Sequence, residues 1–261
     1  MTAREVEAAV LEIAPLEYAL EGDANGLLYG DPEAEVTGIA VTWTPTVAVL
    51  REAAVEGLNF VFTHEVPFFS GGESSWFRTL ADDERPHNMA RRRILDEHGM
   101  VICRSHSNWD GAPGGVMDSA AEALGFTVEA HRGSHCCTYD IEPLTLAELA
   151  DHAKLALGVP SVRVAGDLGR TIWRVTLHYG GLAQRWHAVD EAVIAEADAI
   201  ICGEALDYTI RAAVDAGVGL VETAHVASEN PGVRELATLL AERLPNIPVR
   251  FIDAGMPWVL L

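Results

Sequence analysis

Lysine is almost absent from this 261-residue sequence, in which Lys154 is the only one. Lysine and arginine together number 18 against 39 aspartates and glutamates, so the formal net charge is -21 at pH 7. Proteins bind the phosphates of duplex nucleic acid and of anionic membranes chiefly through Lys and Arg. The charge balance therefore argues against both partners. An anionic substrate would have to be met by local arginines, backbone amides or metal cations.

Long apolar runs are also missing, because none approaches the roughly 20 residues that span a bilayer. The first ten residues alternate charge and alanine rather than resembling a signal peptide, so we expect a cytoplasmic address and no membrane partner. No CxxC spacing occurs, which argues against a zinc knuckle or a redox pair. We expect the cysteines to be mostly buried thiols: Cys103, Cys136, Cys137 and Cys202.

One pattern recurs three times along the chain. A helix ends at a glycine, a short apolar strand follows, and a histidine comes just past the strand. The glycine and histidine of each copy are Gly57 and His64, Gly99 and His106, and Gly217 and His225. Short apolar strands alternating with helices predict largely parallel sheets covered by helices. Polar side chains past the carboxyl ends of such strands lie where α/β proteins bind ligands.

The first and third copies also match each other, as AAVEGLNFVFTH against AAVDAGVGLVETAH. We therefore predict an α/β fold with two pseudo-equivalent α/β halves, each with a largely parallel central sheet flanked by helices. The predicted domains are residues 1–127 and 128–261. A metal site is expected at the C-terminal ends of strands, between the halves.

Helix starts are predicted from local capping signals. Two capping boxes and one Thr-Pro pair each mark a start: Thr2 with Glu5, Thr145 with Glu148, and Thr44 with Pro45. Asn230 followed by Pro231 predicts the start of another helix. That assignment leaves His225 and Glu229 in the loop ahead of it.

Acidic side chains accompany the strand-end histidines. Asp110 lies in a Gly- and Pro-rich turn that can point its carboxylate back across the strand ends, although a plain turn or capping aspartate is the alternative. His225 and Glu229 have the i, i+4 spacing of paired ligands, although Glu229 could instead complement a helix dipole. His64 and Glu65 can face one site only if their strand has ended. Mixed N and O ligands suit zinc, iron or manganese, and a carboxylate can bridge two ions.

Two other segments carry weaker signals. A dense cluster contains His131, His135, Cys136 and Cys137, but no second cluster completes a four-ligand zinc site. Gly180-Gly181 could cradle a phosphate, although a turn is the simpler interpretation.

The chain resembles the Nif-three-like family of dinuclear-metal hexameric proteins, often labelled type 2 GTP cyclohydrolase I homologues. The resemblance rests on four segments in order: Asn25 to Pro32, Thr63-His64, His106 to Gly115, and His225 to Glu229. It implies two divalent ions held by His64, Asp110, His225 and Glu229, with bridging carboxylates and His106 close by. It also implies a toroidal homohexamer with metal sites facing an internal cavity.

The sequence departs from that family at two positions. Glu65 stands where the family usually has a second histidine; as a ligand it would favour Mn, Mg or Fe over Zn, or the second ion would be weak or absent. Thr209 follows Tyr208 where the family tends to have a Tyr-His pair. We therefore expect one or two divalent ions per chain and an activity that can differ from that of relatives.

The leading hypothesis is a metal-dependent hydrolase acting on a small, nucleotide-like substrate, with His106 or Glu65 handling the proton. A cyclohydrolase reaction would release formate, and phosphoester hydrolysis would release phosphate. The alternative is a non-catalytic, ring-forming binding or assembly protein in which metal stabilises the fold or is stored. A metal-free nucleotide binder is a weaker third reading, because no GxGxxG follows the first strand and no P-loop occurs.

Overall fold

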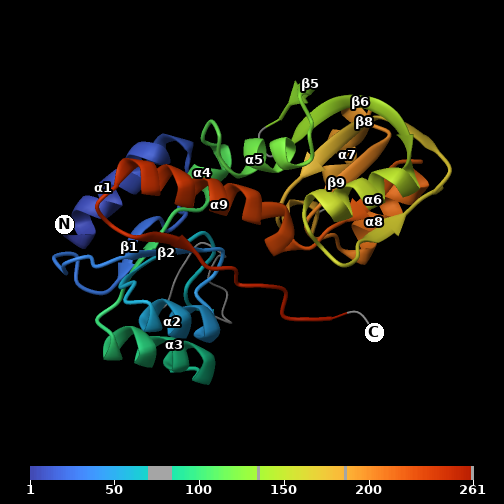
Figure 1. Cartoon of the computed structure of the whole chain (residues 1–261). Helices are drawn as coiled ribbons and strands as arrows, with labels where there is room; N and C mark the ends of the chain where they lie inside the picture. The colour runs from blue at the N-terminus through green and yellow to red at the C-terminus, as the bar shows by residue number, and fades with distance from the viewer. Residues whose placement is uncertain (70–83, 134–135, 185–186, 260–261) are drawn as a thin grey trace. The chain divides into compact units, whose positions relative to one another are not determined.

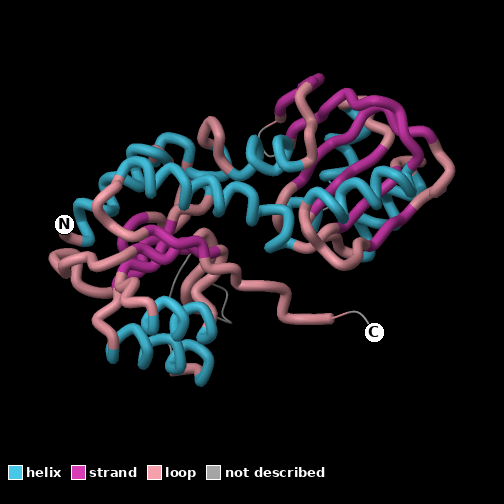
Figure 2. Tube along the Cα trace, in the orientation of Figure 1, coloured by secondary structure: helices cyan, strands magenta, loops and turns pink. Residues whose placement is uncertain are grey.

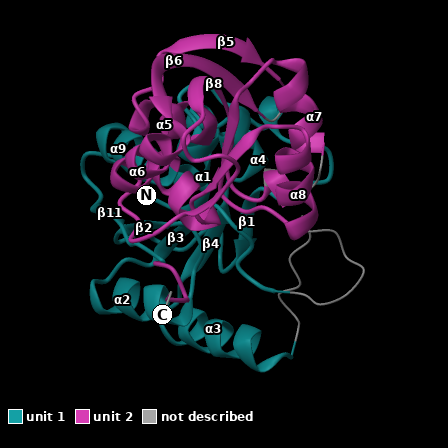
Figure 3. Cartoon of the chain, turned by 90° about the vertical axis from the view of Figure 1, so that its right-hand side faces the viewer, with its two compact units in different colours: residues 1–115, 233–254 teal, residues 116–232, 255–261 magenta. Residues whose placement is uncertain are grey.

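The computed structural model of the chain describes residues 1–69, 84–133, 136–184 and 187–259. The chain forms two compact units, coloured separately in Figure 3: unit 1 is Met1–Gly115 with Val233–Ala254, and unit 2 is Val116–Gly232 with Gly255–Leu261. The domain boundary expected at 127/128 stays a prediction. Within the described residues, every helix is too short or too polar to cross a bilayer.

Unit 1 is an α/β layer structure built on one sheet (Figure 2). Its elements in chain order are α1 (Ala3–Ile13), η1 (Leu16–Tyr18), β1 (Gly26–Tyr29), β2 (Ile39–Thr42), α2 (Val47–Val55), β3 (Phe60–Thr63), α3 (Pro86–Glu97), β4 (Val101–Arg104), α4 (Ser107–Gly111) and β11 (Val249–Phe251). Helix α9 (His225–Arg243) begins in unit 2 and ends in unit 1.

The unit 1 sheet is largely parallel, as predicted. Its described strands run in the order β1-β4-β3-β2-β11, and every neighbouring pair except β1 with β4 is parallel. Helices α2 and α3 lie on one face and α1 on the other (Figure 1). Apolar side chains from α2, α3 and the strands form a buried cluster that includes Leu50, Val61, Leu95 and Ile102. This packing fixes the carboxyl ends of β3 and β4 side by side.

Unit 2 contains the second sheet and its helices. Its elements in chain order are α5 (Val116–Ala123), β5 (Val128–Arg132), β6 (Cys137–Thr145), α6 (Leu146–Ala156), β7 (Arg163–Ala165), β8 (Thr171–His178), η2 (Leu182–Gln184), α7 (His187–Ile194), β9 (Ala199–Cys202), α8 (Asp207–Asp215) and β10 (Gly219–Glu222). The α/β class predicted for both halves is therefore confirmed.

The unit 2 sheet is more antiparallel than the sequence predicts. Its described strands run in the order β5-β6-β8-β9-β10-β7, and only β8 with β9 and β9 with β10 pair in parallel. A continuous apolar run in the sequence indicates a strand that is buried on both faces. An antiparallel strand can have one face in water, and such a strand lacks the continuous run. Strand β5 is exposed along its whole length, so no such run marks it.

The repeated pattern of glycine, strand and histidine is confirmed. Gly57, Gly99 and Gly217 all have positive φ, at 73°, 56° and 72°, just before β3, β4 and β10. This left-handed conformation ends each helix at little steric cost for glycine. The strands that follow place three histidines just past strand ends.

Two capping predictions are confirmed and one is wrong. Both capping boxes are present, at the starts of α1 and α6. Helix α2, however, is capped by Thr46, whose hydroxyl accepts a hydrogen bond from the Val49 amide, and not by Thr44. The Thr44 carbonyl instead accepts from the Thr46 amide, so the chain turns once before the helix begins.

The loop expected from His225 to Glu229 is also wrong, because α9 begins at His225 and continues through Pro231 to Arg243. A proline inside a helix removes one backbone hydrogen bond, and the longer helix tolerates that loss here. Ala224, with φ 90°, turns the chain directly from β10 into the helix. His225 and Glu229 therefore occupy one face of the first helical turns.

Candidate metal centre

Three predicted site residues of unit 1 come together at one sheet edge. His64 follows β3, His106 follows β4 two residues later, and Asp110 lies on α4. Strands β3 and β4 are parallel with Thr63 opposite Arg104, so the residues beyond them emerge at the same edge. One potential ligand atom from each of His64, His106 and Asp110 lies within 4.8 Å of the others.

His64 is fully buried and fixed by the backbone. Its Nδ1 lies 3.1 Å from the carbonyl oxygen of Ser105, which can only accept, so Nδ1 is the protonated nitrogen. Its Nε2 lies 3.4 Å from Oδ1 of Asp110. A backbone carbonyl on the remote ring nitrogen is the support that metal-binding histidines usually have.

His106 is fixed by Asp23, a residue that the sequence did not single out. The imidazole Nδ1 donates to Asp23 Oδ2 at 2.9 Å, which leaves Nε2 3.9 Å from Oε1 of Glu65. Asp23 also accepts from Nη1 of Arg104 at 2.6 Å and from the Ser107 amide at 3.0 Å. A carboxylate behind an imidazole orients the ring and raises its basicity.

The charges around this pair determine its protonation. Burial alone would raise the pKa of Asp23, but its bond to His106 and the charges of His106 and Arg104 hold that pKa well below its usual range. Burial opposes the charged form of His106, yet the bond to Asp23 and the nearby Asp110 carboxylate raise its pKa overall. His106 can therefore hold a proton next to Asp110 and Glu65.

The loop before β1 supplies a second contact that holds His106. The side-chain oxygen of Asn25 accepts from the His106 amide at 2.9 Å. The sequence of this segment, rich in Gly, Asn and Asp, indicated only a turn. The role of Asn25 could have been suspected from its position at the start of the first segment that resembles the family. Asp23 lies two residues upstream of that motif and had no signal of its own.

Unit 2 brings together the other two predicted ligands. His225 Nε2 lies 3.2 Å from Oε1 of Glu229, one helical turn later on α9, and the Glu229 side chain is almost completely buried. Oε1 of Glu204 approaches the other ring nitrogen, Nδ1, at 3.5 Å. Ala224, immediately before this pair, has the positive φ that non-glycine residues rarely adopt. Such strain concentrates at functional sites.

Gly180 closes the unit 2 group from the β8 side. A Cβ at this position would overlap the carboxylate of Glu229 and would lie 2.9 Å from Nε2 of His225. The Gly180 amide donates to the Ser228 hydroxyl at 2.8 Å. Gly180-Gly181 is therefore a tight turn packed against the two ligands, which is the simpler of the two interpretations of this pair.

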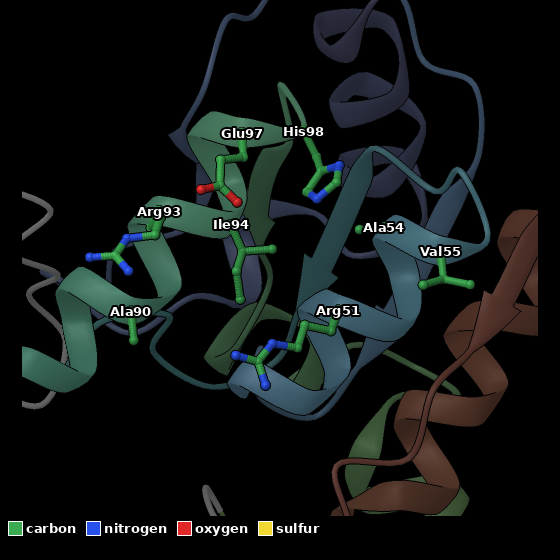
Figure 4. Close-up of a pocket in the computed structure, with 8 residues that line it drawn as sticks. All are labelled: Arg51, Ala54, Val55, Ala90, Arg93, Ile94, Glu97 and His98. Carbon is green, nitrogen blue, oxygen red and sulfur yellow. The ribbon is translucent and has the colours of Figure 1, made fainter.

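Two hollows differ in their relation to these residues. One of about 470 Å³, between α2 and α3, is lined by residues such as Arg51, Ile94 and His98 and contains none of the predicted ligands (Figure 4). The other, of about 270 Å³, lies beside His225 in unit 2. Its lining includes Gln184, Glu204, Glu222 and Trp258. Thr209, at the second departure from the family pattern, is completely buried in α8.

The donor set fits hard or borderline divalent ions. Imidazole nitrogens, of which that of His64 is fully buried, together with carboxylates are the ligands that Zn²⁺, Fe²⁺ and Mn²⁺ take. In unit 1 the donor atoms are His64 Nε2 and an Asp110 oxygen, with His106 and Glu65 beside them. In unit 2 they are His225 Nε2 and Glu229 Oε1.

The family model described as Duf34/NIF3 (NGG1p interacting factor 3) matches residues 1–256. The chain belongs to the Duf34/NIF3 family. A Clostridium perfringens protein called "GTP cyclohydrolase 1 type 2 homolog" is 27% identical over 251 residues, covering 92% of this chain and 91% of the relative. A Streptomyces coelicolor protein of the same name is 27% identical over 241 residues, covering 87% of this chain and 81% of that one.

Solved structures agree with this Duf34/NIF3 fold. A structure described as protein ybgI, of unknown function, has a TM-score of 0.83 at 27% identity and covers 99% of this chain and 100% of its own. A Bacillus cereus protein related to NIF3 has a TM-score of 0.81 at 17% identity and covers 100% and 99%. The resemblance inferred from the motifs is thus confirmed. The word "homolog" in the relatives' names leaves their catalytic activity unestablished.

Proposed function

We propose that this Duf34/NIF3 protein is a divalent-metal-dependent hydrolase of a small, nucleotide-like substrate. One or two ions are held by His64, Asp110, His225 and Glu229, and Glu65 is the additional ligand of a second ion. The observation that carries the proposal is the meeting of His64, His106 and Asp110 within 4.8 Å, with both imidazoles anchored through Nδ1. The His64 imidazole, anchored through Nδ1 and with Nε2 beside the Asp110 carboxylate, has the support that metal-binding histidines usually have.

When bound, the ions supply a lowered pKa for water and positive charge against the substrate. The chain itself supplies the proton chemistry. His106 moves a proton at Nε2, because Asp23 holds its Nδ1 and the raised pKa of His106 favours the protonated ring. Glu65, 3.9 Å from that Nε2, is the second group able to take a proton.

The hollow beside His225 supports a substrate with an aromatic ring and hydrogen-bond donors. Trp258 lines the hollow with an aromatic side chain, and Gln184, Glu204 and Glu222 line it with oxygens that can accept from ring N–H groups. One oxygen of Glu222 already accepts from Arg163, and one of Glu204 from Gln184. A purine combines a flat π surface with such donors. The names of the Clostridium perfringens and Streptomyces coelicolor relatives agree with a cyclohydrolase reaction, in which water opens the purine ring.

Product analysis tests this proposal. The protein, loaded separately with Mn²⁺, Fe²⁺ and Zn²⁺, is incubated with GTP, and formate and phosphate are measured. Formate release supports a cyclohydrolase, and phosphate release supports a phosphoesterase. His106→Asn should lower either rate by about 100-fold while leaving metal content unchanged, since general acid-base groups contribute about 10²–10⁴-fold.

The competing proposal is a ring-forming, non-catalytic binding or assembly protein, and a toroidal hexamer is compatible with either role. If metal-loaded protein releases neither product from a panel of nucleotides, while His225→Ala lowers both the metal content and the melting temperature, the binding role replaces the hydrolase. Light scattering measures the mass of the assembly directly.

A further inference from the structure

A further group of metal-ligand residues lies inside unit 2 and shares no residue with the centre described above. Cys136, His178 and Glu191 each offer an atom within 4.8 Å of the others. Cys136 and His178 are buried, with 2% and 0% of their surface exposed. Cys136 belonged to the dense cluster noticed in the sequence, whereas His135 lies outside the described residues and His131 is exposed on β5.

Sheet register brings the first two of these residues together. Cys137 on β6 pairs with Leu177 on β8, so the preceding Cys136 faces His178 at the end of β8. Side chains two residues apart on a strand share a face. Thr138 and Thr176, the next pair on that face, join their hydroxyls at 2.9 Å. Cys136 and His178 thus lie next to the Thr138-Thr176 pair on the same face of strands β6 and β8.

Helix α7 supplies the third residue over that face. Its apolar side chains Ala188, Val189 and Ala192 belong to the buried cluster of this layer. Glu191, on the same helix, places Oε2 at 3.8 Å from His178 Nε2. About a third of the Glu191 side chain is exposed, at 31%, whereas its Oε2 atom, which faces His178, is buried.

We propose that Cys136, His178 and Glu191 form a mononuclear site for a zinc-class ion, which joins α7 to the β6-β8 pair. Ligands of tetrahedral zinc at bond lengths of 2.0–2.3 Å stand roughly 3.3–3.8 Å apart. The His178-Glu191 separation of 3.8 Å exceeds the spacing of an N–O pair by a few tenths of an ångström. All three ligand atoms lie within 4.8 Å of one another, so shifts of about 1 Å or less bring the group to bonding geometry. Thiolate, imidazole and one carboxylate leave the fourth position for water.

The chemistry of the thiol makes binding and proton release inseparable. Burial, with the charge of Glu191, raises the pKa of the Cys136 thiol to about 12, so the group stays protonated at neutral pH without an ion. Binding forms a bond from sulfur to the metal and releases the thiol proton to solvent. A soft thiolate ligand selects Zn²⁺ or Fe²⁺ over Mg²⁺ or Mn²⁺.

The site has a structural consequence for the centre described above. His178 is two residues before Gly180, whose turn packs against His225 and Glu229. An ion on His178 would fix the end of β8 and, through it, that turn. The two sites also differ in their ligands: the proposed catalytic centre has only imidazoles and carboxylates, whereas this site includes the Cys136 thiol.

Cobalt substitution tests the site on the full-length protein, because only thiolate ligation gives a sulfur-to-Co²⁺ charge-transfer band in the near ultraviolet. At saturation we expect the intensity of the band to correspond to about one thiolate-bound Co²⁺ per chain. It should vanish in Cys136→Ser. It should persist in Cys137→Ser, the matched control one residue away, which contacts Met117 on the opposite face. Absence of the band in the wild type, or its survival in Cys136→Ser, overturns the proposal.

Two further variants keep the test decisive if Cys136→Ser fails to fold. Glu191→Gln changes a residue on the partly exposed helix α7. The Co²⁺ affinity measured by titrating the charge-transfer band should fall by about 10-fold or more in this variant. An unchanged affinity in that variant overturns the site. His225→Ala should retain the band, because its histidine belongs to the other centre, and loss of the band there also overturns a separate site.

Discussion

The Nδ1 atom of His106 donates a hydrogen bond to Oδ2 of Asp23 at 2.9 Å, across 83 residues of sequence. The same carboxylate binds Arg104, which also donates from Nε to the carbonyl of His64 at 3.1 Å. One buried carboxylate thus holds the imidazole of His106 directly and, through Arg104, the backbone of His64. The arrangement makes Asp23 a positioning residue for the proposed centre.

Asp23→Asn should destabilise the protein by about 3 kcal/mol at pH 7, because it leaves the buried Arg104 guanidinium without its charged partner. The pKa of Asp23 is lowered on folding, so its contribution is complete above the unfolded value of 3.8 and is lost as the pH falls below it. Urea unfolding of wild type and variant from pH 7 to pH 3 measures the difference, which should shrink below about pH 4.

A matched control for that experiment is Asp151→Asn, since Asp151 is exposed and pairs only at the surface with Lys154. It should change stability by less than about 1 kcal/mol at any of these pH values. An effect of Asp23→Asn no larger than that of the control would remove Asp23 from the account.

Gly180→Ala should reduce metal affinity by about 10-fold or more, because the added methyl group overlaps the Glu229 carboxylate and strains a backbone whose φ is +55°. Gly181→Ala is the control: its Cβ would lie 3.1 Å from the Gln184 amide nitrogen, a flexible side-chain end. Titration calorimetry with Mn²⁺ compares the two. Equal losses in both variants would show that the turn, rather than the clash with Glu229, controls binding.

Glu65→His should shift selectivity toward zinc. Carboxylate oxygen suits Mn²⁺ and Mg²⁺, whereas imidazole suits Zn²⁺, so the ratio of zinc to manganese affinity should rise by about 10-fold. The substitution also supplies the second histidine usual in the family. Competition between the two ions, followed by elemental analysis, measures the ratio. No change in that ratio would mean that Glu65 does not contact an ion.

Local signals in the sequence were enough to predict the strand ends of this site. Gly57, Gly99 and Gly217 marked three helix ends, and the apolar runs after them gave β3, β4 and β10 with their histidines correctly placed. These features depend on backbone conformation and burial over a few residues, which is why a single sequence carries them.

Features that depend on contacts between distant segments were not predicted. The contact between Asp23 and His106 depends on the pairing of β1 with β4, and that between Gly180 and Glu229 depends on the packing of the end of β8 against α9. The prediction that α9 starts at Asn230-Pro231 was wrong, because tertiary packing keeps the helix continuous although Pro231 removes one hydrogen bond. The exposed β5 lacked the apolar run from which a strand would be recognised.

Elemental analysis of protein purified without chelator tests the central claim most directly, with wild type compared to His64→Ala and His225→Ala. Because the Cys136 group provides a separate site, each sample is also measured in the Cys136→Ser background. We predict about one or two divalent ions per chain there, falling below about half an ion in either histidine variant. Fewer than about 0.5 ions per chain in Cys136→Ser alone, with no rise on reconstitution, would contradict the account.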